Sequence, residues 1–195
     1  GDHRDLHVRS RRQRQMCIRD RAYTAGEKDY SALVSKLKSK NIDVLYIGCY
    51  HAEAGLMARQ MKDQSMNVQI ISGDALVTQE YWNITGDAGE GTLMTFGPDP
   101  RGKPSAKAVV KKFEAAGLNP EGYVLYSYAA LQVFEQAATK AKSTKPNDVK
   151  KAMRSTAFDT VIGTINFDKK GDVIATSKDP LYICYTFSNG VAARL

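Results

Sequence analysis

The sequence predicts an α/β fold in which helices flank a parallel sheet, and three features of the chain carry this prediction. An apolar run, Val44–Ile47, stops at Gly48 and leads through a short polar loop into a segment with helical periodicity. A second apolar run, Val68–Ser72, is likewise followed by a glycine. A third run covers residues 92–96. An apolar strand, a glycine and an amphipathic helix form half of a βαβ unit, and repeated units of this kind build a parallel sheet.

The loop Gly48–His51 and its counterpart after the second strand are where we expect the functional site. Ligands of open parallel sheets bind just outside the carboxyl ends of the strands. Right-handed crossovers bring these ends to one edge, so Tyr50 and Asp74 are predicted neighbours in one cleft. Asp74 has two interpretations, because its carboxylate can contact a ligand or cap the turn at residues 75–77. The pattern alone favours neither.

The remaining elements are predicted from periodicity and capping. A helix is expected over residues 30–40, with Asp29 as its cap and Asn41 in the left-handed conformation that ends such helices. Further helices are expected over residues 78–84, 105–116, 122–141 and 147–154, and strands over 161–162, 165–167 and 181–187. Asn147 is expected to cap the helix at 147–154. The strand at 181–187 is expected to be the last one, with no strand after it.

Two stretches bear on the arrangement of the chain. Gly97–Pro100 interrupts the pattern sharply, and we interpret it as a crossing between two lobes. The helix at 122–141 carries Tyr123, Tyr126 and Tyr128. Aromatic side chains there could form a stacking platform, but helical spacing favours core packing.

Composition excludes several classes of protein. The chain has 195 residues, 43% of them hydrophobic, with a mean hydropathy of −0.40, which indicates a soluble protein with a real core. No apolar run approaches the roughly 20 residues of a membrane span. The three cysteines form no CxxC pair and have no metal-ligand spacing.

The net charge of +7 comes mostly from residues 1–21, which hold seven arginines against three aspartates. The other 174 residues hold 21 Lys and Arg against 18 Asp and Glu, too even a balance to suggest nucleic acid. We expect residues 1–21 to be a non-native or disordered basic tail, because Met16–Arg21 resembles translated sequencing-adaptor DNA. On this hypothesis the chain is truncated at its amino terminus, and a missing signal peptide is uninformative.

Other chemistry at the first loop is disfavoured by what the sequence lacks. A phosphate cradle would need GxGxxG or GxxxxGK[ST] spacing, which is absent. His51 and Glu53 match the H-x-E half of a zinc deaminase site, but no P-C-x-x-C follows. Cys49 as a nucleophile has His51 nearby in sequence, yet a small buried residue is the favoured role. We expect no catalytic residue, metal or cofactor.

Four segments, taken together, resemble the periplasmic leucine/isoleucine/valine-binding proteins of ABC importers, which have the type I substrate-binding fold. The segments lie in the family's order at residues 24–55, 83–96, 126–132 and 161–173. The resemblance implies two α/β lobes joined by three crossing segments, with the ligand trapped by hinge closure. It implies that 22–98 is a second-lobe segment and that 99–160 are helices of the first lobe. Residues 161–195 would be the crossover and return.

The resemblance also implies roles for particular residues. The tyrosine at the position of Tyr50 packs on the ligand, and an acidic residue at the position of Asp74 receives the α-ammonium. Members of the family have glutamate there, so the aspartate leaves the preferred side chain open. Residues that would hold these two in place without contacting the ligand are Cys49, His51, Gly73 and Ala75.

The function implied is capture of an amino acid of the branched-chain type, with membrane permease subunits as partners and a periplasmic location. One alternative is a sensor or receptor domain of the same fold for amides or other small polar ligands. Another is a flavodoxin-like or Rossmann-like enzyme, which the absent phosphate loop and catalytic pairs disfavour.

Overall fold

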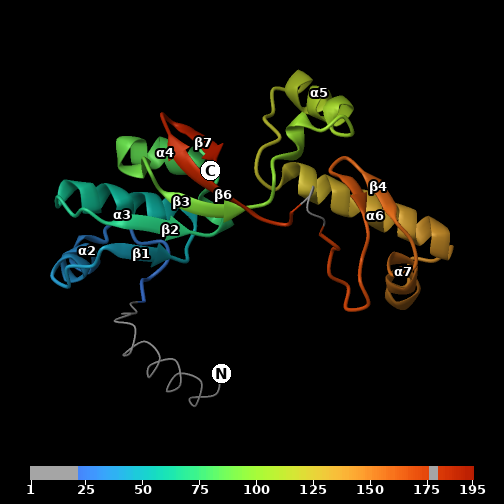
Figure 1. The fold of residues 1–195 in the computed structure, drawn as a ribbon, viewed down its shortest axis with the longest axis horizontal. Coiled ribbons are helices and arrows are strands. Elements are labelled where there is room, and N and C mark those ends of the chain that lie inside the picture. Colours follow the sequence, from blue (N-terminus) through green and yellow to red (C-terminus); the bar gives the residue numbers. More distant parts are fainter. Residues whose placement is uncertain (1–21, 176–179) are drawn as a thin grey trace, which may run out of the picture.

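The chain forms two bodies that lie side by side (Figure 1). A computed structural model describes residues 22–175 and 180–195. Residues 22–98 and 183–194 form what we call the sheet body, and residues 99–175 form the helix body. The predictions for residues 1–21, including Cys17, lie outside the described residues.

Five strands make the sheet, in the spatial order β1 (Val44–Ile47), β2 (Gln69–Ser72), β3 (Leu93–Phe96), β6 (Ile183–Ser188) and β7 (Val191–Arg194). The first three are parallel, as predicted. β6 and β7 are antiparallel additions, so the sheet is mixed. The expectation that no strand follows residue 187 was wrong. Asn189 and Gly190 both have positive φ, which suits a tight two-residue hairpin turn and allows β7 to fold back on β6.

The sheet body also contains α2 (Ser31–Lys38), α3 (His51–Asp63), η1 (Asp74–Leu76), α4 (Gln79–Thr85) and η2 (Gly86–Gly89). The buried face of α3 is the predicted one, formed by Ala54, Met57, Ala58 and Met61. These side chains join one core with buried residues of the sheet and α4. That core fixes the strand ends from which the first loop emerges.

Capping at α2 differs slightly from the prediction. The N-cap is Tyr30 and not Asp29. The Asp29 carboxylate nevertheless accepts a hydrogen bond from the Ser31 amide at 2.9 Å, and so satisfies one of the free N–H groups at the start of the helix. Asn41 has the predicted left-handed conformation, with φ of 47°.

The helix body contains η3 (Pro100–Gly102), α5 (Lys107–Ala115), α6 (Val124–Ala141), α7 (Pro146–Met153), β4 (Phe158–Thr160) and β5 (Gly163–Ile165). One strand differs in its bounds and two predictions fail here. The strand expected over residues 165–167 is β5, which runs over residues 163–165. Lys145, not Asn147, is the N-cap of α7, because Pro146 occupies the first helical position, where its missing N–H costs nothing. Val161 and Ile162 form the turn of the β4–β5 hairpin and not a strand, since Thr160 pairs with Gly163.

Separate cores hold the helix body together. One contains Val133, Ala137, Val149, Ala152 and Phe158, and the other contains Ala106, Leu125, Ala129 and Val161. Neither shares buried residues with the core of the sheet body. Each body thus has its own buried residues, and Tyr126 of α6 packs against the core of the sheet body from the helix body.

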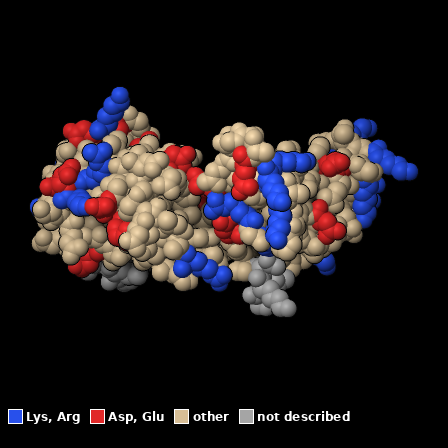
Figure 2. Space-filling view, turned by 90° about the horizontal axis from the view of Figure 1, so that it is seen from above, with Lys and Arg blue, Asp and Glu red and all other residues tan. Residues whose placement is uncertain are grey.

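The surface carries mixed charge. On the face seen in Figure 2, Lys and Arg side chains are interspersed with Asp and Glu along both bodies. No described helix is both long enough and apolar enough to traverse a bilayer.

Candidate ligand-binding site

The carboxyl ends of β1 and β2 lie together, as the crossover argument predicted. Ile47 pairs with Ser72, and the buried Ser72 hydroxyl donates to the Ile47 carbonyl at 2.8 Å. Tyr50 follows as the N-cap of α3 with its side chain 72% exposed. Asp74 follows as the first residue of η1. Both residues thus leave the same sheet edge, and no hydrogen bond in the described part of the chain joins them.

Asp74 does not cap the turn that follows it, which excludes one of its two interpretations. η1 has no side-chain cap among the described residues, and α4 is capped instead by Thr78, whose hydroxyl accepts the Tyr81 amide. The Asp74 carboxylate accepts a hydrogen bond at Oδ2 from the hydroxyl of Tyr123. The acidic side chain therefore points across the junction, toward the helix body.

Tyr123 contacts Asp74 and lines the cavity at the junction, which the sequence did not predict. It was assigned to the core, but its side chain is 55% exposed. It is the N-cap of α6 and so precedes the regular helix on which the periodicity argument rested. Its ring meets Phe96 of β3 edge-on, with centroids 4.9 Å apart and an interplanar angle of 89°. Tyr128, in contrast, packs against a core of the helix body, as predicted.

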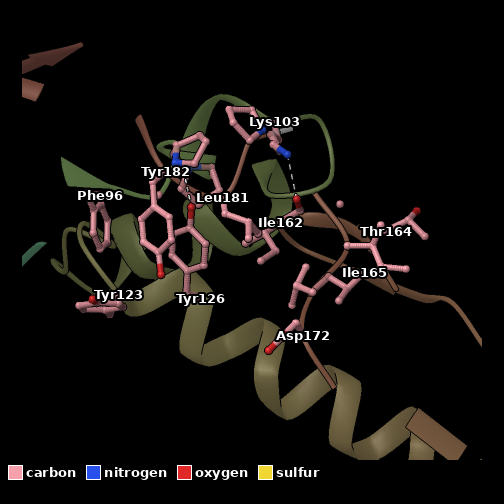
Figure 3. A pocket seen from close by; sticks show the side chains of 17 residues that line it. Phe96, Lys103, Tyr123, Tyr126, Ile162, Thr164, Ile165, Asp172, Leu181 and Tyr182 are labelled. Carbon is pink, nitrogen blue, oxygen red and sulfur yellow. Dashed lines mark hydrogen bonds between the residues drawn. The ribbon is translucent and has the colours of Figure 1, made fainter. Parts of the chain in front are cut away.

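A cavity of about 590 Å³ lies at the junction of the two bodies (Figure 3). Its walls are mainly aromatic and aliphatic and include Phe96, Tyr123, Tyr126, Ile162, Leu181 and Tyr182. Lys103 and Asp172 supply its charged side chains, and Lys103 Nζ donates to the Ile162 carbonyl at 3.0 Å. Tyr50 and Asp74 do not line it, and Tyr123 connects it to Asp74.

The crossing segment forms one side of this cavity. The Tyr126 hydroxyl donates to the Pro98 carbonyl at 2.6 Å. Burial raises the pKa of Tyr126 to about 12, with the nearby Tyr185 hydroxyl and Asp99 carboxylate acting in the same direction. Arg101 grips Asp99 through Nε and Nη2, the latter at 2.7 Å from Oδ2. On this side the cavity is therefore bounded by a crossing segment whose Pro98 and Asp99 are both hydrogen-bonded to side chains.

The four residues expected to support the site are the chain neighbours of Tyr50 and Asp74, and they differ in their surroundings. Cys49 is half-buried with a free thiol, and burial raises the pKa of that thiol to about 11. His51 is the first residue of α3, while Gly73 and Ala75 flank Asp74 on the chain. Residues 22–175 and 180–195 contain no group of three or more His, Cys, Asp or Glu placed to hold a metal ion.

The structure thus combines an open α/β sheet, a crossing segment, a second body and a cavity at their junction. The chain belongs to the periplasmic binding protein family, whose profile matches residues 14–182. This confirms the resemblance carried by the four sequence segments.

Curated relatives agree with this assignment. The Leu/Ile/Val-binding protein homolog 1 of Brucella suis biovar 1 is 51% identical over 170 residues, which cover 87% of this chain and 45% of that protein. An amino acid binding protein of Pseudomonas aeruginosa is 43% identical over 152 residues, covering 77% of this chain and 41% of the relative. The chain thus spans less than half the length of these relatives.

Solved structures show the same fold. Leucine binding protein LivK from Thermotoga maritima matches with a TM-score of 0.74 and 28% identity, over 89% of this chain and 49% of that one. LivJ from Streptococcus pneumoniae, in complex with isoleucine, matches with a TM-score of 0.69 and 20% identity, over 89% and 51%. A solute binding protein from Rhodopseudomonas palustris, in complex with benzoate, matches with a TM-score of 0.70 and 16% identity, over 89% and 48%. These matches confirm the predicted fold class.

Proposed function

We propose that this chain is part of the substrate-binding component of an ABC importer for amino acids of the branched-chain type. In this proposal the protein catalyses no reaction, works in the periplasm and presents its ligand to permease subunits in the membrane. Relatives named for leucine, isoleucine and valine binding, at up to 51% identity, support this assignment.

The observation that carries the proposal is the placement of the Asp74 carboxylate. It lies at the carboxyl edge of the parallel strands and points toward the second body, where Tyr123 meets it. An ammonium that leaves water for a closing cleft needs an ionised partner, because otherwise its desolvation is uncompensated. We assign the α-ammonium of the ligand to Asp74.

Tyr50 completes this side of the proposed site. Its ring is 72% exposed at the end of β1, the strand that pairs with the one preceding Asp74. An aromatic ring and a carboxylate at the same sheet edge suit a ligand with an apolar side chain and an ammonium group. We assign Tyr50 to packing against that ligand.

The test uses a completed protein, in which the Brucella suis relative supplies the part of its length that this chain does not cover. Isothermal calorimetry with leucine, isoleucine and valine should give saturable binding. Asp74→Ala should weaken it by at least about thirtyfold, since breaking a buried charge pair costs about 2–5 kcal/mol. Asp87→Asn, an exposed acid on η2, is the matched control and should leave affinity unchanged.

The screen also includes amides and simple carboxylates. The fold holds benzoate in a Rhodopseudomonas palustris protein, so it accommodates a ligand without an ammonium group. Tight binding of amides with no binding of amino acids would replace the importer assignment with a sensor or receptor for small polar ligands. Unchanged leucine affinity in Asp74→Ala would remove Asp74 from the site.

A further inference from the structure

We propose that the hydroxyl of Tyr123 is a positioning group for Asp74, holding one carboxylate oxygen so that the other faces the ligand's ammonium. This inference rests on the proposed function of Asp74 and adds a residue of the opposite body to the same site. Tyr123 stands at the start of α6, and Asp74 stands at the start of η1. Their hydrogen bond joins the helix body to the sheet body beside the strand ends.

The tyrosine ring is itself held in place. Phe96 of β3 meets it edge-on at 4.9 Å, and the same Phe96 ring packs against Tyr126, one turn further along α6, at 5.8 Å. Phe96 is 6% exposed and belongs to the core of the sheet body. The direction of the Tyr123 hydroxyl is therefore set by a rigid neighbour on the same body as Asp74.

The division of labour at Asp74 follows from its acceptor capacity. An ionised carboxylate offers about four acceptor positions on its two oxygens. Tyr123 uses Oδ2, and no described residue donates to Oδ1. An aspartate fixed in this way has lost its rotational freedom before the ligand arrives, so less conformational entropy is lost on binding. Tyr123 in this role does not replace the ligand's charge but orients the group that receives it.

Tyr126 provides a matched control on the same helix. Its hydroxyl also donates a hydrogen bond, but to the backbone carbonyl of Pro98 and not to Asp74. Tyr123→Phe and Tyr126→Phe each remove one hydroxyl and keep one ring against Phe96. A difference between the two variants thus isolates the bond to Asp74.

The first experiment needs no ligand and uses the 195-residue chain with ¹³C-labelled aspartate carboxyl groups. The Asp74 resonance, assigned through Asp74→Asn, should move in Tyr123→Phe and stay in place in Tyr126→Phe. A resonance that is unmoved by Tyr123→Phe would overturn the positioning role even if the completed protein binds leucine. The proposed function fails separately, through absence of amino-acid binding by the unsubstituted completed protein.

The second experiment compares two ligands of the completed protein by calorimetry, leucine and 4-methylpentanoate, which is leucine without its ammonium group. Tyr123→Phe should weaken leucine binding by about tenfold, because hydrogen bonds to charged groups are the stronger ones. It should leave 4-methylpentanoate binding unchanged. Equal weakening of both ligands would instead assign Tyr123 to packing, and no weakening of either would show its hydroxyl to be idle.

Discussion

Tyr126 and Tyr185 bond the same crossing segment from opposite bodies. The Tyr126 hydroxyl, on α6, donates to the Pro98 carbonyl at 2.6 Å, and the Tyr185 hydroxyl, on β6, donates to the Gly97 carbonyl at 3.1 Å. The Tyr185 oxygen also lies 3.1 Å from the amide of Asp99, from which it accepts. Three consecutive residues of the connection, 97 to 99, are therefore hydrogen-bonded to side chains of both bodies.

Gly97→Ala should disturb this arrangement. A Cβ at Gly97 would overlap the Tyr126 oxygen and lie 2.8 Å from Cζ, so the Tyr126 ring would have to shift. We expect a loss of about 1–3 kcal/mol in the free energy of unfolding, as for other overpacked sites. Urea titration measures it. Gly102→Ala, where nothing lies within 4 Å of the added Cβ, is the control, and equal losses in the two variants would contradict the close approach of Tyr126.

The Cys49 thiol should react slowly with alkylating agents at neutral pH. Burial raises its pKa to about 11, so the reactive thiolate is scarce until the solution is strongly alkaline. In a variant lacking Cys17 and Cys184, the rate of iodoacetamide modification should rise about tenfold per pH unit from pH 8 to near that pKa. A rate that levels off near pH 8.5 in the folded protein would show the thiol to be unshifted.

The same shift has a consequence for stability. The folded state keeps the Cys49 proton at pH values where the unfolded chain releases it. Its contribution to stability is therefore fully present below the ordinary thiol pKa and declines as pH rises from about 9 toward 11. Cys49→Ser should flatten the alkaline fall in the urea midpoint, and an unaltered fall would assign it to other groups.

The outer face of α6 should govern the solubility of the chain. Leu131 is 70% exposed and Phe134 is 47% exposed on this helix, while Leu125 is fully buried. Contiguous exposed apolar side chains promote association. Leu131→Glu should reduce self-association, measured by light scattering after gel filtration, without lowering the melting temperature. Leu125→Glu, which buries an unpaired charge, should unfold the helix body, and equal effects of the two would refute the assigned faces.

Gly190 and Gly26 form a matched pair for testing the hairpin. Both have φ of 82°, but a Cβ at Gly190 would lie 3.1 Å from Nε1 of Trp82, and none of the described atoms lies within 4 Å of one at Gly26. Both alanine variants should lose about 1 kcal/mol or more to backbone strain, and Gly190→Ala should lose more. Because Trp82 is the chain's single tryptophan, its fluorescence reports the displaced contact. Equal losses of stability in the two variants, with unchanged Trp82 emission, would show that Trp82 does not contact the turn.

The sequence pattern correctly predicted the elements that are determined by residues within their own segment. The spacing of Met57 and Met61 predicted the buried face of α3, and the run Val44–Ile47 predicted β1 with the observed bounds. Right-handed crossover then placed Tyr50 and Asp74 at one edge, because that rule follows from chirality and not from side-chain identity.

Two of the failures depend on contacts outside the segment that was interpreted. β7 is short and mostly exposed, and it is a strand because β6 offers it an edge. Tyr123 precedes its helix, and its contact with Asp74 joins residues 49 positions apart, which no period of two or 3.6 residues encodes. The contact between the two bodies could therefore be learned only from the structure.

The insertion of the helix body between β3 and β6 orders events during synthesis. Leu93 pairs with Thr186, so β3 stays an open edge on the ribosome until β6 has emerged. Contacts this distant in sequence form slowly, since a long loop must close first. The helix body, whose cores draw on residues 106–167, can assemble before the sheet is complete. A nascent chain that stops at residue 175 would present a finished helix body beside a sheet lacking Tyr185 and Phe187, a target for chaperones and proteases.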